Sequence, residues 1–479
     1  MPIVHWFRRD FRIHDNTALR HACRDSADGV VPVFVFDDAI LRHPDCGAPI
    51  VRFMLDCLAE LRDNLRADGG DIILMHGKPV QMLREIARQT AATAVYYNKD
   101  YAPAAVERDE EVERLLGADG IDVKGFKDQV IFEEQEILTA GGGLPYTVYT
   151  PYKNAWLKRF RERGIEVLGK PKMIFAKPMR GLKSMRMPSA AELGFESKHR
   201  IDIEAGEGAA LRRLGAFCSN KLKDYQANRD FPAIDGSSRL SPHLRHGTIS
   251  PRQCLNAALK TGSKGADAWV AELIWRDFFQ QVLFNFPHVE KAPFKRNFRK
   301  LKWRRSDADW KRWTDGITGY PIVDAAMRQL NQTGWMHNRL RMVVSMFLAK
   351  DLFLDYRLGE RYFMRNLIDG ETAQNNGGWQ WSAGTGTDAQ PYFRVFNPTA
   401  QGKKFDPKGA FIRRYCPELE RVTDQFIHCP HEMPTAEQQR VGCRIGIDYP
   451  AQMVDHAKAR LRAINRFRAV AKNSAKRPS

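Results

Sequence analysis

The sequence predicts an α/β part followed by an all-helical part, and three observations support this division. Up to residue 130, short apolar runs alternate with amphipathic segments, which is typical of a doubly wound, Rossmann-like parallel sheet. From residue 206 onward, long amphipathic windows with short Gly and Pro breaks predict helices. A chain of 479 residues is also too long for one core. We therefore expect a sheet domain at 1–130, a linker at 131–205 and a helical domain at 206–479.

Four apolar runs in the sheet domain are predicted strands, and two segments between them have helical spacing. The strands are expected at 2–6, 30–36, 71–75 and 94–97, and the helices near 50–65 and 80–88. Open α/β sheets bind ligands beyond the carboxyl ends of their strands. The loops FRRDFRIHDN and YYNKDYAP are therefore expected to face such a crevice. The sequence contains neither the Gly-rich dinucleotide fingerprint nor a P-loop.

The predicted linker has two kinds of sequence. GGGLPYTVYTPYKNAW, at 141–156, is rich in turn residues and then becomes helical. Residues 169–198 are basic and contain Pro and Met with little periodicity, which is typical of a long surface connection. For most of this segment, an irregular link without a function of its own is the favoured interpretation.

The charge of the chain suits a polyanionic partner. Lys and Arg number 75 against 57 Asp and Glu, which gives a formal net charge of +18. Such an excess neutralises phosphates and releases counterions when a protein binds nucleic acid. The alternative is a generally basic enzyme without a nucleic-acid partner.

The eight cysteines follow no C-x-x-C spacing, so we expect reduced thiols rather than disulfides or a metal site. The apolar runs are far shorter than the ~18 residues of a membrane span. Strand-like sequence begins at once, without the pattern of a signal peptide. These observations favour a cytoplasmic protein that has no membrane association.

The stretch 360–397 is the one most suited to a ligand. Its centre, NNGGWQW at 375–381, joins two asparagines, two glycines and two tryptophans. Indoles pack on flat rings, amides hydrogen-bond to polar ring edges, and glycines allow the backbone to approach a ligand. By these properties alone, a buried Trp-rich helix start is about as good an explanation as a cofactor site.

The motifs around this stretch resemble the photolyase/cryptochrome family, and most closely the bacterial class I cyclobutane pyrimidine dimer photolyases. NNGGWQW is preceded by TGWMHNRLRM and followed by FNPTAQGKKFD, and the likeness begins at HWFRRDFRIHDN and continues to about residue 460. The resemblance implies a light-harvesting antenna domain, a helical domain that binds FAD, and light-dependent repair of thymine dimers in DNA. It also implies a monomer.

The resemblance implies an FAD site built from a small-residue turn and from the Trp-rich stretch. Hydroxyls and backbone amides of the turn suit a pyrophosphate, although most such turns are only helix caps. Asn375 would face flavin N5, where a neutral amide supports the reduced flavin and plant cryptochromes typically carry an acid. The implied FAD contacts are Tyr225, Ser237, Ser238, Arg239, Leu240, Ser241, Arg341, Asp369, Gly370, Glu371 and Asn375.

The implied lesion pocket includes Glu272, Trp275 and Arg276, which share roughly one face of a predicted helix with Phe279. Without the resemblance, an ordinary salt-bridged helix is favoured. With it, Glu272 stabilises the radical anion of the damaged base, Trp275 stacks on the lesion, and Arg276 lies at the DNA surface. The implied DNA or lesion contacts are Arg229, Glu272, Trp275, Arg276, Asn338, Arg339, Met342, Trp381 and Gln401.

The family reduces its flavin through three tryptophans that lead to the surface. The inner position matches Trp379 and the outer one Trp303, but Tyr356 occupies the middle position. Because tyrosine oxidation is coupled to loss of the phenolic proton, we predict slower photoreduction or a bypass through another aromatic residue. The implied catalytic residues are Glu272, Asn375, Trp379, Tyr356 and Trp303.

The antenna chromophore remains open at this stage. Folate-binding photolyases carry an Asn-Glu pair where this chain has Ala104 and Ala105, and a cysteine where it has Glu290. These departures argue against methenyltetrahydrofolate. The loop YYNKDYAPAAVERD is more similar to the deazaflavin type, with Arg52 as a candidate contact.

Three rival functions are compatible with parts of the sequence. A cryptochrome would use the same fold for signalling, but the chain ends in the short tail AKNSAKRPS, and the lesion pocket is complete. Repair of (6-4) lesions or of single strands is disfavoured by Met342 in MHNRLRM, since (6-4) photolyases carry histidines in the pocket. The third rival is a basic flavoprotein that does not bind DNA.

Overall fold

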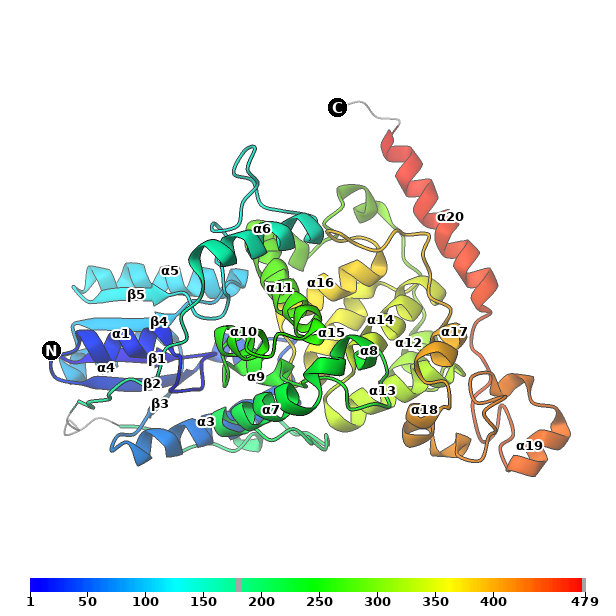
Figure 1. The fold of residues 1–479 in the computed structure, drawn as a ribbon, viewed down its shortest axis with the longest axis horizontal. Coiled ribbons are helices and arrows are strands. Elements are labelled where there is room, and N and C mark those ends of the chain that lie inside the picture. Colours follow the sequence, from blue (N-terminus) through cyan, green and yellow to red (C-terminus); the bar gives the residue numbers. More distant parts are fainter. Residues whose placement is uncertain (177–182, 476–479) are drawn as a thin grey trace.

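A computed structural model describes residues 1–176 and 183–475. The sheet and its helices occupy one end of the molecule, and the helical part forms the larger remainder (Figure 1). The basic tail beyond 475 and the part of the 169–198 segment at 177–182 lie outside the described residues. No described helix has the length and apolar character needed to cross a membrane.

The sheet is parallel and five-stranded, in the order β3-β2-β1-β4-β5, which confirms the doubly wound prediction. The four predicted strands are present, and their buried apolar side chains explain why they could be recognised. The fifth strand was missed, because DVKGF lies at the sheet edge with only exposed or half-buried residues and has no apolar run. The strands are β1 Ile3–Phe7, β2 Val30–Phe36, β3 Ile73–His76, β4 Ala94–Asn98 and β5 Asp122–Phe126.

Helices cover both faces of the sheet. One face buries Phe7 and Phe34 against apolar side chains of α1 and α3. The other face buries Trp6 and Val33 against α4 and α5. The helices of this part are α1 Thr17–Asp25, α2 Asp38–Leu41, α3 Ala48–Ala67, α4 Pro79–Thr90 and α5 Pro103–Ala118.

The connecting segment packs more closely than a surface linker. Its helix α6, Tyr149–Arg163, lies against α11, Lys264–Asn285, of the helical part. Phe175 then forms a parallel bridge to Val30 of β2, and the Met185 N–H donates to the Leu74 carbonyl at 2.9 Å. The expectation of a mere surface link is thus wrong for these stretches, because apolar residues of the segment join the core around the sheet.

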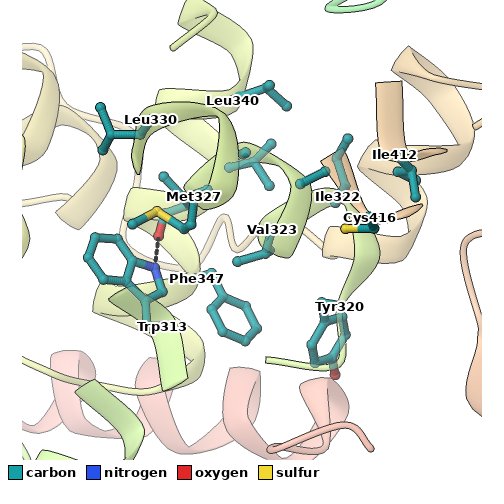
Figure 2. Close-up of a cluster of buried hydrophobic side chains, with 14 of the residues drawn as sticks. Trp313, Tyr320, Ile322, Val323, Met327, Leu330, Leu340, Phe347, Ile412 and Cys416 are labelled. Carbon is teal, nitrogen blue, oxygen red and sulfur yellow. Dashed lines mark hydrogen bonds between the residues drawn. The ribbon is translucent and has the colours of Figure 1, made fainter. Parts of the chain in front are cut away.

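The second part is built from helices, as predicted. Its core centres on Trp313, Met327 and Phe347, which are buried between α12, α13 and the π-helical turn η5, Phe347–Asp351 (Figure 2). The helices are α7 Glu207–Asn220, α8 Tyr225–Asn228, α9 Ser241–His246, α10 Pro251–Leu259, α11 Lys264–Asn285, α12 Asp307–Asp315, α13 Pro321–Thr333, α14 Asn338–Met346, α15 Tyr356–Asn366, α16 Thr372–Ala383, α17 Pro398–Phe405, α18 Ala410–Tyr415, α19 Thr435–Val441 and α20 His456–Ala475.

The loop after β1 joins the two parts instead of leaving an open crevice. Arg12 donates to the Gly247 carbonyl at 2.9 Å and pairs with Asp128, while Asp15 pairs with Arg252 at 3.1 Å. All these side chains are buried. The carboxyl edge of the sheet, where a ligand was expected, is therefore partly occupied by contacts to the helical part.

Candidate functional site

Helix α16 lies at the centre of the candidate site and packs against α11, α14 and α15. Asn376 and Gln380 anchor it, since their side-chain amides each donate to the Val289 carbonyl at 2.9 Å. Asn375 donates one N–H to the Glu360 carbonyl at 2.8 Å, which leaves its side-chain oxygen for another partner. Trp379 follows one turn later and is 2% exposed. One helix thus presents an amide and an indole to the interior.

Glu371, just before α16, is surrounded by cationic side chains. Its carboxylate pairs with Arg9 and with Arg276, the latter at 3.3 Å, and accepts from Gln280 at 2.6 Å. Burial opposes the charge, but Arg276, Arg9 and Arg245 outweigh it and lower the pKa of Glu371 to about 2. Because the carboxylate is committed to these groups, the flavin contact predicted for Glu371 would have to come from its backbone.

Asp369 and Gly370 lie beside this cluster. Asp369 is 7% exposed and accepts two hydrogen bonds from Arg341, at 2.7 and 3.1 Å. The Gly370 carbonyl accepts from Arg245 at 2.7 Å. A paired carboxylate and a fixed backbone offer oriented polar groups to a ligand without leaving an unpaired charge in the interior.

The predicted phosphate turn borders a basic cavity of about 290 Å³. Ser237 and Ser238 line the cavity together with Arg212, Arg213 and Lys221, and the acidic lining residue, Glu204, pairs with Arg212 at 2.7 Å. Burial and the neighbouring charge of Arg239 lower the pKa of Arg213, so an anion placed here would relieve a repulsion between cations. The cavity therefore suits a phosphate group.

The other residues of the turn have separate roles. Arg239 has a positive φ of 50° and lies over the Trp335 ring, 4.9 Å from its centroid. Leu240 is buried, and Ser241 opens helix α9. Tyr225 is 8% exposed and lies nearby on α8. The buried indole N–H groups of Trp335 and Trp379 have no hydrogen-bond partner in the described structure, which is unusual for buried donors.

Glu272 and Arg229 form a half-exposed ion pair on the other side of the site. Their closest atoms are 2.8 Å apart, and both side chains are 30% exposed. Burial raises the pKa of Glu272, and the attraction of Arg229 opposes this shift. A carboxyl group in this setting keeps its proton to higher pH than an ordinary glutamate does. Protonated, it can donate a hydrogen bond to a carbonyl.

Trp275 stacks on Tyr149, a residue that sequence reasoning missed. Their ring centroids are 3.6 Å apart and the ring planes differ by 7°. The Tyr149 hydroxyl donates to the Ala271 carbonyl at 2.6 Å, which fixes the phenol against α11. Nothing in PYTVYTPYKNAW indicates that this tyrosine folds back onto a helix more than a hundred residues later. Tyr149 thus covers one face of the expected lesion-stacking indole.

Arg276 does not lie where we predicted it. It is 7% exposed, and its guanidinium donates to the Gln129 carbonyl as well as to Glu371. It therefore belongs to the buried arginine cluster rather than to the surface. The helical spacing correctly put Arg276 beside Trp275, but adjacent helix positions point in different directions.

Helices α14 and α17 complete the half-exposed face. Asn338 is exposed and Met342 half-buried, as expected for groups that meet a ligand from outside. Arg339 pairs with Asp230 at 2.9 Å and lies 4.4 Å from the Phe405 ring centroid. Trp381 and Gln401 are half-buried, and the buried side-chain oxygen of Gln401 lacks a hydrogen-bond partner in the part of the chain described.

The residues of the expected electron relay are only partly connected. Trp303 and Tyr356 are in edge contact, with centroids 6.1 Å apart. The ring contacts of Trp379 are with Phe363 at 5.0 Å and Trp313 at 6.2 Å, and none with Tyr356 occurs among the described residues. The inner indole is thus in contact with an aromatic residue that the sequence analysis did not single out.

The segments that carry the folate-type antenna positions approach each other, since Ala102 packs in the same small cluster as Val289, and Ala105 is buried. Ala104 is exposed on α5, and Glu290 is exposed in the turn η3, Pro287–Glu290. Arg52 is exposed on α3 and donates to the His199 carbonyl at 3.2 Å. Within residues 1–176 and 183–475, no group of three His, Cys, Asp or Glu side chains is placed to hold a metal ion.

Two family descriptions match long segments of the chain. Residues 3–172 match "DNA photolyase", and residues 269–469 match "FAD binding domain of DNA photolyase". The first segment contains the sheet, and the second contains α16 with the residues around it.

Named relatives match over nearly the full length. The deoxyribodipyrimidine photo-lyase of Escherichia coli (strain K12) is 40% identical, with 98% of each chain covered. That of Vibrio cholerae is 41% identical, covering 95% of this chain and 97% of the relative. A class III photolyase structure from Agrobacterium tumefaciens has a TM-score of 0.90 and 37% identity over 98% of both chains. A Synechocystis cryptochrome structure has a TM-score of 0.86 and 27% identity, covering 97% and 99%. The chain belongs to the photolyase/cryptochrome family.

Proposed function

We propose that this protein is a light-dependent DNA repair enzyme, a lyase that splits cyclobutane pyrimidine dimers with FAD. One observation carries the proposal. The half-exposed carboxyl of Glu272 lies on the same helix as the half-buried ring of Trp275, and that helix packs directly on α16. Three parts of a repair site are thus adjacent. Glu272 can stabilise a charged base, Trp275 offers a stacking surface, and α16 is the helix expected to contact the cofactor.

The interior fits a flavin dinucleotide. The basic cavity at Ser237 and Ser238 suits its phosphates, and Asp369 with Arg341 offers oriented polar groups. The free oxygen of the Asn375 amide would meet the polar edge of the flavin ring. The indole N–H groups left without partners are the kind of donors that a bound polar ligand satisfies. When bound and reduced, FAD supplies the photoexcited electron that opens the dimer.

Residues of this chain would prepare the lesion for that electron. A flipped dimer would stack against Trp275, which Tyr149 holds from behind, and the opposite wall would come from Met342 and Trp381. When it carries a proton, Glu272 would donate a hydrogen bond to a base carbonyl, and this bond strengthens when the base gains negative charge. Asn338, Arg339 and Gln401 would meet the DNA around the lesion.

Phosphate contacts would provide affinity without reading the sequence of the DNA. The net charge of +18 supports this part of the proposal, and binding should weaken as salt is added. We further propose that the protein acts as a cytoplasmic monomer. All eight cysteines are free in the structure, which suits a reducing compartment. A deazaflavin-type antenna contacted by Arg52 is the alternative we favour over a folate.

The proposed function is tested with an oligonucleotide that contains one thymine dimer. The FAD-loaded protein is reduced, mixed with this DNA, and illuminated with blue light while the absorbance of intact thymine is followed. We expect recovery in the light and none in a dark control. Binding to the dimer without recovery under light would favour a photoreceptor role of the cryptochrome kind. Failure to bind DNA at all would support a flavoprotein with no DNA role.

A further inference from the structure

A second column of indoles leads from Trp379 toward the surface through Trp313 and Trp310. The Trp379 and Trp313 centroids are 6.2 Å apart, and Trp313 and Trp310 stack at 5.4 Å with ring planes 27° apart. Trp379 and Trp313 are buried, whereas Trp310 is half-buried on α12. Each indole therefore touches the next, and the last one reaches water.

Electron transfer through Tyr356 is disfavoured because an oxidised tyrosine has to lose its phenolic proton. Burial and the nearby charge of Glu360 raise the pKa of Tyr356 far above its ordinary value. An oxidised phenol is a strong acid, but no carboxylate or histidine is hydrogen-bonded to the Tyr356 hydroxyl among the described residues. Removing an electron from Tyr356 would thus leave a buried, strongly acidic cation without a proton acceptor.

Trp313 does not have this requirement. Its indole N–H donates to the Val344 carbonyl at 3.1 Å, and its ring lies in the apolar cluster with Met327 and Phe347 (Figure 2). An oxidised indole is a far weaker acid than an oxidised phenol, so Trp313 can pass the charge on while it keeps its proton. Because Trp313 is buried among apolar side chains, a cation is more stable on half-buried Trp310, where water can solvate it.

We propose that Trp313 and Trp310 form the working electron relay of this protein. The inference rests on the proposed function, since it takes Trp379 as the residue next to the flavin. With a light-excited flavin bound beside it, Trp379 would give up one electron, Trp313 would pass one electron to Trp379, and Trp310 would pass one electron to Trp313. Trp310 then releases its indole proton to water. An external thiol is finally oxidised as it returns an electron and a proton to Trp310.

The test compares single substitutions in FAD-loaded protein without DNA. Transient absorption and time-resolved EPR measure the yield of the long-lived amino-acid radical after a light pulse. We expect Trp310→Phe and Trp313→Phe to lower this yield at least fivefold, and Trp303→Phe to retain it. The radical in the wild type should have the spectrum of a tryptophan. An equal or larger loss in Trp303→Phe, or a tyrosyl spectrum, would overturn the inference.

Further variants separate the relay from folding and from the flavin assignment. Trp310→Phe changes a half-buried side chain, so it tests the relay even if Trp313→Phe does not fold. Tyr356→Trp added to Trp313→Phe should restore the radical yield, because it opens the other route. If the radical yield of the double variant stayed as low as that of Trp313→Phe, the inference would be contradicted. Trp379→Phe should abolish the radical in every background, and its failure to do so would refute the flavin site rather than the relay.

Discussion

Tyr149 and Trp275 show how a single side chain outside a motif shapes the site. The two rings are nearly parallel with centroids 3.6 Å apart, so Trp275 can offer only its other face to a ligand. Aromatic pairs of this kind contribute about 0.5–1.5 kcal/mol beyond the area they bury. The sequence motif identifies Trp275 but contains no signal for Tyr149, since a contact 126 positions away is a product of the fold.

Replacing Tyr149 tests this support. Tyr149→Ala should weaken binding of dimer-containing DNA by about threefold to tenfold, because Trp275 loses the ring that holds it. Binding of undamaged DNA should stay unchanged. Tyr149→Phe is the matched control, since it keeps the stacked ring and loses only the 2.6 Å hydrogen bond to Ala271. A fluorescence anisotropy titration measures both, and equal affinities of the Ala variant and the wild type would refute the role.

Lys350 is a buried cation without a carboxylate partner among the described residues. It is 1% exposed, and its ammonium lies 3.8 Å from the Phe467 ring centroid. Burial, and to a smaller extent Lys295, lower the pKa of Lys350 to about 7. In the unfolded chain its pKa is ordinary, so between that value and pH 7 the unfolded state binds more protons. Lys350 therefore makes the free energy of unfolding increase as the pH rises above 7.

Lys350→Met should remove this dependence. At pH 6 the variant should be more stable than the wild type by about 1–3 kcal/mol, since a cation without a carboxylate partner no longer has to be buried. The difference should shrink by pH 9, where the folded wild type holds Lys350 neutral. Denaturant unfolding at both pH values measures it, with exposed Lys291→Met as the control. A difference that grows with pH would contradict the assignment.

At the scale of an element, α16 combines packing and function in adjacent residues. Gly377 faces α11, where an added Cβ would overlap the Phe279 ring. Gly378 faces open space, with nothing within 4 Å of such a Cβ. Of these two neighbouring glycines, Gly377 is thus required by packing, whereas Gly378 leaves room for a side chain. From sequence alone, both glycines were interpreted in the same way, as allowing the close approach of a ligand.

The two glycines can be compared directly by substitution with alanine. Gly377→Ala should destabilise the protein by about 1–3 kcal/mol, because the ring of Phe279 must move in a packed interior. Gly378→Ala should stabilise it by about 0.5–1 kcal/mol, because alanine is the better helix former and meets no neighbour. Thermal unfolding of the two variants measures the contrast. If both substitutions stabilise the protein, the close contact between Gly377 and Phe279 of α11 is contradicted.

Local sequence pattern predicted most elements but not their long-range partners. Strands with buried apolar runs, such as Val30–Phe36, were predicted from residue type alone. The edge strand Asp122–Phe126 was missed because its residues are exposed or half-buried and its sequence has no apolar run. The spacing on α11 put Arg276 near Trp275, but the direction of Arg276 depends on Glu371, 95 positions later. The family motifs supplied most of the candidate site, and the fold supplied its supporting contacts.

Across the whole molecule, the arginine cluster around Glu371 joins the sheet part to the helical part. Arg9 from the loop after β1 contacts Glu371 and pairs with Asp100 at 3.1 Å. Arg245 and Arg276 approach the same carboxylate from the helical side. A buried carboxylate that attracts guanidinium groups from both sides fixes the relative position of the two parts. It also places α16 next to the carboxyl edge of the sheet.

Glu371→Gln should destabilise the protein by about 3–5 kcal/mol at pH 7, because it leaves buried arginines without their counter-charge. The pKa of Glu371 is lowered to about 2 when folded, so its contribution is complete above the ordinary pKa of a glutamate. As pH falls toward 2, the wild type should approach the variant. Calorimetry at pH 7 and pH 3.5 measures this. Exposed Glu107→Gln is the control, and an equal effect there would refute the role of the cluster.

The most direct test of the repair site is the yield of repair per absorbed photon at saturating DNA. Chemically reduced, FAD-loaded wild type and Glu272→Gln are compared, so that photoreduction plays no part. We predict repair in the light only, with a several-fold lower yield in Glu272→Gln, because a neutral amide stabilises the anionic dimer less than the carboxyl does. The wild-type yield should fall as pH rises through the raised pKa of Glu272, and the variant should show no such fall. Equal yields and pH profiles in the two proteins would contradict the account.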